Sequence, residues 1–404
     1  MAAAAYEAVP VAEDVYWVGA VDWELRNFHG YSTHRGSTYN AYLILDEKVT
    51  LVDTVKKPFF PVMMERIASV VDPGAVRYVI SNHAEMDHSG SLSDFVSSAR
   101  PERILASARG VEALRDHFHW SVEVEAVAEG TRLSLGRLSL SFFEASMLHW
   151  PESMFTYLPE RRLLFSQDAF GMHLATRNLF WDENDPAILR WEAAAYYANI
   201  LMPYSRLVTR KLEQIKGLGV ELIAPDHGPV WRDEGVGRIL EWYRRWSSRQ
   251  VREAATVVYD TMWGSTARMA DAIVDGLSGG GLEVEVCPLA GSDRSDVATA
   301  CVEAAALVVG SPTLNGGVFP RIADVLSYLE GLKPPVRVGA AFGSYGWAEG
   351  ATGQIGASLE RMGVRVVGSP LTLRYVPGPE GLAQCVQFGR KLAGEVKKEL
   401  DEGR

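Results

Sequence analysis

The sequence predicts an α/β protein with two domains, and three observations support this. The chain has 404 residues, which is enough for two hydrophobic cores. Between residues 15 and 237 it reads as short strands with a few helical stretches, which predicts an αββα sandwich of two sheets covered by helices. From residue 255 apolar strands alternate with amphipathic helices, which predicts a doubly wound parallel sheet. We place the domains at residues 1–250 and 251–404.

The elements of the first domain follow from the period of its apolar residues. Gly, Asp and Ser turns separate short apolar runs, and these runs predict strands at residues 42–45, 50–52, 76–80, 132–135, 138–143 and 163–165. A helical period predicts helices at residues 59–71, 111–118 and 191–212. The charged and aromatic stretch 239–252 predicts a helix that closes this domain.

The second domain alternates more regularly. Its apolar runs predict strands at residues 255–259, 282–288, 304–310, 337–342 and 364–371. The stretches between and after them predict helices at residues 266–277, 321–329, 353–362 and 383–400. Strands that alternate with helices in this way are typical of a parallel sheet with helices on both faces.

The composition excludes some classes of function. A net charge of −11 argues against a nucleic-acid partner, which would need a basic face. No apolar run is long enough to cross a bilayer, and residues 1–7 lack the basic segment of a signal peptide. Cys287, Cys301 and Cys385 are too few and too widely spaced for a disulfide framework or a cysteine metal site, which favours a reducing compartment. We therefore expect a cytoplasmic protein without a membrane or nucleic-acid partner.

A cluster of metal-binding side chains follows the apolar run at residues 76–80. Four of the six residues in His83-Ala84-Glu85-Met86-Asp87-His88 are ligand types, and we expect them in a loop at a strand end. His149, Asp168 and His227 stand alone farther along the chain. A polar loop in a solvated turn is the alternative for the cluster at residues 83–88, and a packed side chain is the alternative for His149; Asp168 and His227 gain weight as ligands only together with the others. Together the seven N and O ligands are too many for one tetrahedral ion and suit two, and the mixture without cysteine favours iron or zinc.

Three loops in the second domain follow predicted strands. Residues 261–266 open a helix with hydroxyl side chains and backbone N–H groups, which is typical of a phosphate site. A Ser/Thr helix cap is the alternative. Residues 311–317 and 343–347 follow two further strands, so all three loops lie at the carboxyl edge of the sheet, where ligands bind in open α/β folds. Glycines there permit close approach to a flat ring, and Tyr345 and Trp347 can stack on it.

These motifs resemble those of flavodiiron proteins, the A-type flavoproteins. The pattern His-x-Glu-x-Asp-His with separate His, Asp and His residues is similar to the metallo-β-lactamase fold as that family modifies it. Hydrolases of this fold have a second His where this chain has Glu85. The segments that begin at Arg26, His149 and Tyr196 also resemble the family. The second domain resembles flavodoxin, and the resemblance covers essentially the whole chain.

The resemblance implies two iron ions and FMN as cofactors. His83, Glu85 and His149 would hold one iron, Asp87, His88 and His227 the other, and Asp168 would bridge them, although the residue at the position of His88 is not bound to metal in some family members. His29 and Tyr197 would face the substrate, with a buried His and a packed Tyr as the alternative. FMN would be held by Thr261, Met262, Trp263, Gly264, Ser265, Thr266, Ser311, Pro312, Thr313, Leu314, Asn315, Gly316, Ser344, Tyr345, Gly346 and Trp347.

The function that the resemblance implies is reduction of O2 to water, of NO to N2O, or of both. Electrons would enter through FMN from rubredoxin or a similar carrier, since no Cys-x-x-Cys pair follows the second domain. A head-to-tail homodimer or a dimer of dimers would place the FMN of one subunit against the iron site of another. The alternative is a dizinc hydrolase with a flavodoxin-like accessory domain, and Glu85 and the aromatic loops count against it. A pure electron carrier would leave the seven ligands unexplained.

Overall fold

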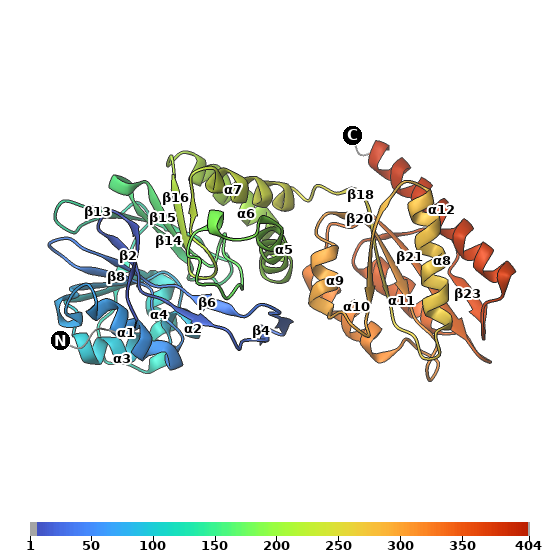
Figure 1. Ribbon diagram of the computed structural model, residues 1–404, viewed down its shortest axis with the longest axis horizontal. Helices are drawn as coiled ribbons and strands as arrows, with labels where there is room; N and C mark the ends of the chain where they lie inside the picture. Colours follow the sequence, from blue (N-terminus) through green and yellow to red (C-terminus); the bar gives the residue numbers. More distant parts are fainter. Residues whose placement is uncertain (1–5, 403–404) are drawn as a thin grey trace. The chain divides into compact units, whose positions relative to one another are not determined.

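The computed structural model describes residues 6–402, so residues 1–5, on which the signal-peptide expectation partly rests, lie outside the described part. The chain forms two compact units (Figure 1). The first contains residues 6–29, Thr33–Tyr196 and Arg206–Arg244. The second contains Gly30–Ser32, Tyr197–Ser205 and residues 245–402. Three parts of the predicted first domain, residues 30–32, 197–205 and 245–250, thus belong to the second unit, and the boundary at residue 250 stays a prediction.

Two sheets form the centre of the first unit. The first has the order β1-β2-β7-β8-β9-β10-β11 and the second the order β12-β13-β14-β15-β16-β17. Their strands are β1 Val9–Ala12, β2 Val15–Trp17, β7 Tyr42–Ile44, β8 Thr50–Val52, β9 Tyr78–Ser81, β10 Arg103–Ser107, β11 Glu125–Val127, β12 Arg132–Ser134, β13 Ser139–Glu144, β14 Met154–Leu158, β15 Leu163–Gln167, β16 Leu222–Pro225 and β17 Trp231–Arg232. A smaller pair joins β3 (Ala20–Asp22) to β6 (Ser37–Tyr39).

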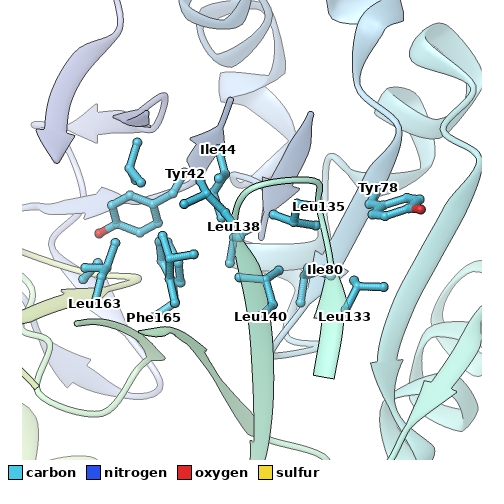
Figure 2. Close-up of a cluster of buried hydrophobic side chains, with 14 of the residues drawn as sticks. Tyr42, Ile44, Tyr78, Ile80, Leu133, Leu135, Leu138, Leu140, Leu163 and Phe165 are labelled. Atoms are coloured by element: carbon cyan, nitrogen blue, oxygen red, sulfur yellow. The ribbon is translucent and has the colours of Figure 1, made fainter. Parts of the chain in front are cut away.

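The hydrophobic core of this unit lies between the two sheets (Figure 2). Side chains two residues apart on one strand face the same side. Tyr42 and Ile44 of β7 therefore point together toward the second sheet, and Leu163 and Phe165 of β15 point toward the first. Ile80 of β9 adds to this layer directly before the ligand cluster begins. The core thus fixes the strand ends that carry the ligands.

Helices cover the outer faces, which confirms the predicted sandwich. On the first sheet, α1 (Phe60–Ala68), α3 (Leu92–Ala99) and α4 (Ala108–Phe118) bury Met63, Ile67, Phe95 and Leu114 in one cluster with residues of the strands. On the second sheet, Trp242 of α7 (Glu234–Ser247) contacts Trp231 of β17 with ring centroids 6.0 Å apart. Within residues 6–402, no helix has the length and apolar character needed to cross a membrane.

The predicted single helix over residues 191–212 is wrong. The structure has α5 (Pro186–Tyr196), a π-helical turn (Tyr197–Leu201), a 3₁₀ turn (Met202–Tyr204) and α6 (Ser205–Lys216). Pro203 explains the break, because its nitrogen donates no hydrogen bond and its ring clashes with the preceding turn. Short helices at residues 294–300 and 86–89 were also missed, as was α3.

The second unit is built on a parallel sheet, as predicted. Its order is β19-β18-β20-β21-β22, with β23 paired to β21. The strands are β18 Arg252–Tyr259, β19 Glu283–Pro288, β20 Ala304–Gly310, β21 Val338–Tyr345, β22 Arg365–Val366 and β23 Leu371–Arg374, and the helices are α8 Ser265–Gly279, α9 Arg294–Ala300, α10 Pro320–Leu332, α11 Ala351–Arg361 and α12 Pro379–Glu402. The predicted strand 364–371 is divided into β22 and β23, because Gly368 takes a φ of 69° and Pro370 follows it.

Candidate metal centre

The structure brings all seven predicted ligands together in the first unit. Potential ligand atoms of His83, Glu85, His149 and Asp168 lie within 4.8 Å of one another, and so do those of Asp87, His88 and His227. Each group follows from the ends of strands: β9 leads to the cluster at residues 83–88, β15 to Asp168 and β16 to His227. The cluster is not entirely a loop as expected, because Met86–Ser89 forms one helical turn, α2. This turn brings Asp87 and His88 close to His227, with which they form the second group.

The first group has the spacing of atoms that share one ion. Glu85 Oε2 lies 3.3 Å from His83 Nε2 and 3.2 Å from His149 Nε2. Asp168 Oδ2 lies 3.3 Å from His83 Nε2 and 2.9 Å from His149 Nε2. With metal–ligand bonds of about 2.1 Å, two ligand atoms of one ion lie roughly 3.0 Å apart in an octahedron and 3.4 Å apart in a tetrahedron. The measured distances fall in this range, so these atoms fit a single ion.

The second group is joined to the first through Asp168. Its other oxygen, Oδ1, lies 3.1 Å from His88 Nε2 and 3.5 Å from His227 Nε2. Asp87 approaches the same two imidazoles, with Oδ1 3.3 Å from His88 Nε2 and Oδ2 3.1 Å from His227 Nε2. One carboxylate oxygen of Asp168 therefore faces each group. This is the arrangement of a carboxylate that bridges two ions.

Buried atoms of this site lack hydrogen bonds, which supports metal binding. Within residues 6–402, no hydrogen bond is formed by Asp168 Oδ1, His149 Nε2, His88 Nε2 or either carboxylate oxygen of Asp87, although all are buried. Buried polar atoms are nearly always paired, since an unpaired one costs free energy. Two cations among these atoms would satisfy them at once. The residues present therefore fit a pair of metal ions.

The electrostatics of the site call for positive charge. Burial alone would lower the pKa of His88, but the carboxylates of Asp87, Asp168 and Asp226 outweigh it and raise the pKa to about 10. Burial also opposes a charge on His83, and hydrogen bonds to Asp168, Glu152 and Glu85 raise its pKa above the usual value. Without metal, protons on the imidazoles neutralise the carboxylates. Metal ions would displace these protons, because a ligand imidazole is neutral.

Two hydrogen bonds orient ligand imidazoles and fix their tautomers. Glu152 Oε1 accepts from His83 Nδ1 at 2.7 Å and from the backbone N–H of Ala84 at 3.0 Å. The carbonyl oxygen of Thr38 accepts from His227 Nδ1 at 2.6 Å. Both acceptors require a proton on Nδ1, so Nε2 is the nitrogen that would bind a metal ion once its own proton is displaced. Neither partner was predicted from the sequence. Glu152 lies within a segment that resembles the family, whereas no local signal marks Thr38.

A buried network supports the turn that carries the first ligands. Asp53 Oδ1 accepts from the backbone N–H of Asn82 and Asp53 Oδ2 from its side-chain nitrogen, both at 2.7 Å. Thr156 donates its hydroxyl to Asn82 Oδ1 at 2.6 Å, which connects the turn to β14 of the second sheet. Burial raises the pKa of Asp53 to about 6, although the hydrogen bonds from Asn82 oppose this. This network holds residue 83 at the point where the two sheets meet.

The two residues predicted to face the substrate have different surroundings. His29 Nε2 lies 2.6 Å from Glu85 Oε1, and 29% of its side chain is exposed, so it sits at the open edge of the first group. The Tyr197 hydroxyl lies 2.8 Å from Ser205 Oγ and its ring packs on Trp246, all within the second unit. The role assigned to Tyr197 stays a prediction.

Two aromatic residues that the analysis did not single out cover the second group. The ring of Tyr196 lies 6.0 Å from that of His227 and 5.1 Å from that of His173. The ring of Phe28 makes edge contacts with His29 at 4.2 Å and His173 at 5.0 Å. His173 is buried, and burial together with the charge of His227 lowers its pKa. These rings form an apolar boundary for the charged site.

In the second unit, the three predicted cofactor loops follow β18, β20 and β21 at the carboxyl edge of the sheet. Hydrogen bonds link them: the hydroxyls of Thr266 and Ser344 lie 2.9 Å apart, and the N–H of Thr313 donates to the carbonyl of Ser344 at 2.9 Å. No side chain within residues 6–402 caps the N-terminus of α8. Its first N–H groups are thus left for an anion.

Glycine and exposed aromatic residues shape these loops. A Cβ on Gly343 would meet the carbonyl oxygen of Ser311 at 2.2 Å, so the two loops approach as closely as glycine allows. Trp263 and Trp347 each expose 89% of their surface, which is unusual for so large an apolar side chain. Loops with open aromatic faces beside a helix N-terminus suit a flat ring that carries a phosphate.

Comparisons with known proteins agree with this division. The family model described as "ODP family beta lactamase" matches residues 38–228, and the flavodoxin model matches residues 257–389. A nitric oxide reductase of Moorella thermoacetica is 44% identical, over 96% of this chain and 99% of that protein. A rubredoxin-oxygen oxidoreductase of Megalodesulfovibrio gigas is 35% identical, over 98% and 99% of the two chains.

A solved structure agrees over the whole chain as well. The crystal structure of the flavodiiron protein from Giardia intestinalis has a TM-score of 0.95 and 34% identity, and the match covers 98% of each chain. Both halves of this chain, and their order, therefore occur together in that protein.

Proposed function

The chain belongs to the flavodiiron protein family, and we propose that it is an oxidoreductase that reduces O2 to water, NO to N2O, or both, at two iron ions. The observation that carries this proposal is the pair of ligand groups that share Asp168. We assign the metal chemistry to residues 1–250 and the flavin chemistry to residues 251–404. Electrons would come from FMN and, before it, from a small carrier protein.

The ligand set favours iron and gas reduction over a dizinc hydrolase. Glu85, Asp87 and Asp168 bring three carboxylates to the site, and they offset most of the charge of two ferrous ions, roughly plus four. Bound iron supplies electrons and positive charge to a diatomic gas. The relatives that match the whole chain are named as reductases and oxidoreductases, which supports this function over the hydrolase.

Each side chain around the metal site can play its proposed role from the position that it has in this structure. The first ion would be held by His83, Glu85 and His149. The second would be held by Asp87, His88 and His227. Glu152 and Thr38 keep the two inner imidazoles in the tautomer that binds metal. His29 lies at the exposed edge and can hold a proton on Nε2 beside Glu85. Reduction of either gas consumes protons, and we propose that His29 supplies them.

The three loops of the second unit would bind FMN. The N-terminus of α8 would hold the phosphate through residues 261–266. The loops at residues 311–316 and 344–347 would contact the ring, with Tyr345 and Trp347 as stacking partners. When bound, FMN would supply a redox centre that can take up and give up electrons one at a time, which suits a one-electron donor. The rubredoxin in a relative's name supports a rubredoxin-type donor for this chain as well.

We propose that the protein is a cytoplasmic homodimer, with the flavin of one subunit against the metal centre of the other. The family resemblance supports this arrangement. Cys287, Cys301 and Cys385 are free and buried, which supports a reducing compartment.

Purified protein tests the proposal directly. We expect two iron atoms and one FMN per chain by metal analysis and visible absorption, and consumption of O2 or NO with reduced rubredoxin as donor. Zinc in place of iron, or an iron-loaded and flavin-loaded protein that consumes neither gas, would contradict it.

A further inference from the structure

A cavity in the first unit lies beside the metal centre, because Thr38, whose carbonyl oxygen accepts from His227, and Gly228 both line it. It has a volume of about 530 Å³ and lies among β1, β2, β3, α1 and the loop at residues 176–179. This volume is within the range of small-molecule sites, roughly 300–1,000 Å³. Trp17, Trp23 and Phe59 are among its aromatic lining residues. Arg66, Arg177 and the aromatic lining residues have no role in the proposed gas reduction.

The cavity contains two arginines without acidic partners. Arg66 and Arg177 both line it, and within residues 6–402 neither forms an ion pair with a carboxylate. Glu7 is the acidic residue in the lining, and it offers Arg66 only its backbone carbonyl. Burial and the charge of Arg177 both lower the pKa of Arg66. Because Arg66 is partly buried, the like charge of Arg177 beside it is costly, and an anion placed between the two would be stabilised.

The Arg66 guanidinium is held with one edge unpaired. It lies over the ring of Trp17 at 4.5 Å and over that of Tyr6 at 5.6 Å. Nη1 donates to the carbonyl of Glu7, while Nε is buried and has no partner within the described residues. The edge formed by Nε and Nη2 is the one that binds carboxylates and phosphates with two parallel hydrogen bonds. The two rings fix its orientation in advance.

The inner wall of the cavity is also preformed. Asn40 Oδ1 accepts from Trp17 Nε1 at 2.8 Å, and Asn40 Nδ2 donates to the carbonyls of Pro225 and Gly228 at 2.7 and 2.9 Å. Asn40 is fully buried. Because these bonds hold the wall, a ligand would not have to order it on binding, and less free energy is lost.

We propose that this cavity binds a small organic anion. Its carboxylate or phosphate would lie between Arg66 and Arg177, and a flat or apolar body would pack on Trp17 and Trp23. The exposed Arg177 would set the access to the site. A neutral molecule of the same shape would gain the aromatic contacts without the charge-assisted hydrogen bonds.

Titration calorimetry on the iron-loaded and flavin-loaded protein tests this, with benzoate, phenyl phosphate and the neutral benzamide as probes. We expect binding of at least one anion, and the tighter of the two identifies the head group. Benzamide should bind at least about tenfold more weakly than benzoate if the carboxylate is the head group.

Arg177→Gln should weaken anion binding about tenfold or more, with no loss of fold, because the side chain is exposed. Arg109→Gln removes an exposed arginine from α4, outside the cavity, and is the matched control. The difference between the two variants distinguishes this site from anion binding at iron. Absence of heat with both anions at millimolar concentration, or equal affinity in the two variants, would overturn the proposal.

Discussion

Glu152 is the residue whose replacement tests the orientation of a metal ligand most sharply. Its Oε1 accepts from His83 Nδ1 at 2.7 Å and from the N–H of Ala84 at 3.0 Å, and both donors are buried. Burial alone would raise the pKa of Glu152, but the bond to His83 lowers it, so the carboxylate is charged at neutral pH. Glu152→Ala removes the acceptor for His83 Nδ1, which has no other among residues 6–402.

The expected losses of iron affinity and of folding free energy in Glu152→Ala follow from these two hydrogen bonds. Loss of a partner behind a metal-bound imidazole costs about 10–100-fold in metal affinity, which corresponds to about 1.4–2.7 kcal/mol. Two buried N–H groups without acceptors add about 1–3 kcal/mol each to the loss of folding free energy. Glu152→Gln retains an acceptor without the charge, so its iron affinity should fall between those of the wild type and Glu152→Ala.

Competition with a chromogenic ferrous chelator measures the affinity of both variants, and urea unfolding measures their stability. The expected order of affinity is wild type, then Gln, then Ala, with the loss confined to one of two iron ions. If the Ala variant is folded and holds both ions as tightly as the wild type, then Glu152 does not orient a ligand and the reasoning fails.

Three further predictions concern the bridge, the protons and the flavin loops. Asp168→Ala should abolish gas consumption, because both groups lose a ligand, while reduction of FMN by an external donor continues; stopped-flow absorption follows the flavin and gas electrodes follow turnover. Ferrous ion added to apoprotein at pH 7 should release at least about one proton per chain, since the pKa of His88 is about 10 and a ligand imidazole is neutral. Iron affinity should therefore rise with pH from 6 to 8, as chelator competition would show. Gly343→Ala should weaken FMN binding at least about tenfold, because its Cβ would lie 2.2 Å from Ser311 O; fluorescence of released flavin measures this.

Each of these has a control and a contrary outcome. Turnover by Asp168→Ala at the wild-type rate would remove Asp168 from the centre. Iron uptake without proton release would mean that the imidazoles are already neutral in the apoprotein. Gly356→Ala, in α11, meets no atom within 4 Å and should bind FMN normally; equal FMN affinity in the two glycine variants would show that the loop approach does not hold the flavin.

The sequence predicted the two folds because periodic apolar residues dominate both. Leu140 and Phe142, or Tyr42 and Ile44, alternate as a two-sheet core requires, and the strand–helix alternation after residue 255 permits few other folds. The ends of helices and strands could not be predicted in the same way, because single Pro and Gly residues set them and the period of the apolar residues does not. Pro203 divides a stretch with helical period, and Gly368 divides a stretch with strand period.

The ligands were predictable because four of them lie within six residues, whereas their hydrogen-bond partners were not. Thr38 reaches His227 from 189 positions away in the sequence, and Glu152 reaches His83 from 69. Such pairs depend on how the two sheets pack, and a single sequence contains no local pattern for them. The placement of Tyr196 beside His227 is of the same kind.

The central claim is that two iron ions share the carboxylate of Asp168. Anomalous diffraction from crystals of the iron-loaded protein, measured on both sides of the iron absorption edge, tests it most directly. We predict two iron peaks, one among His83, Glu85 and His149 and the other among Asp87, His88 and His227, with one oxygen of Asp168 bound to each. A single peak, peaks that do not change across the iron edge, or iron elsewhere in the fold would contradict the account.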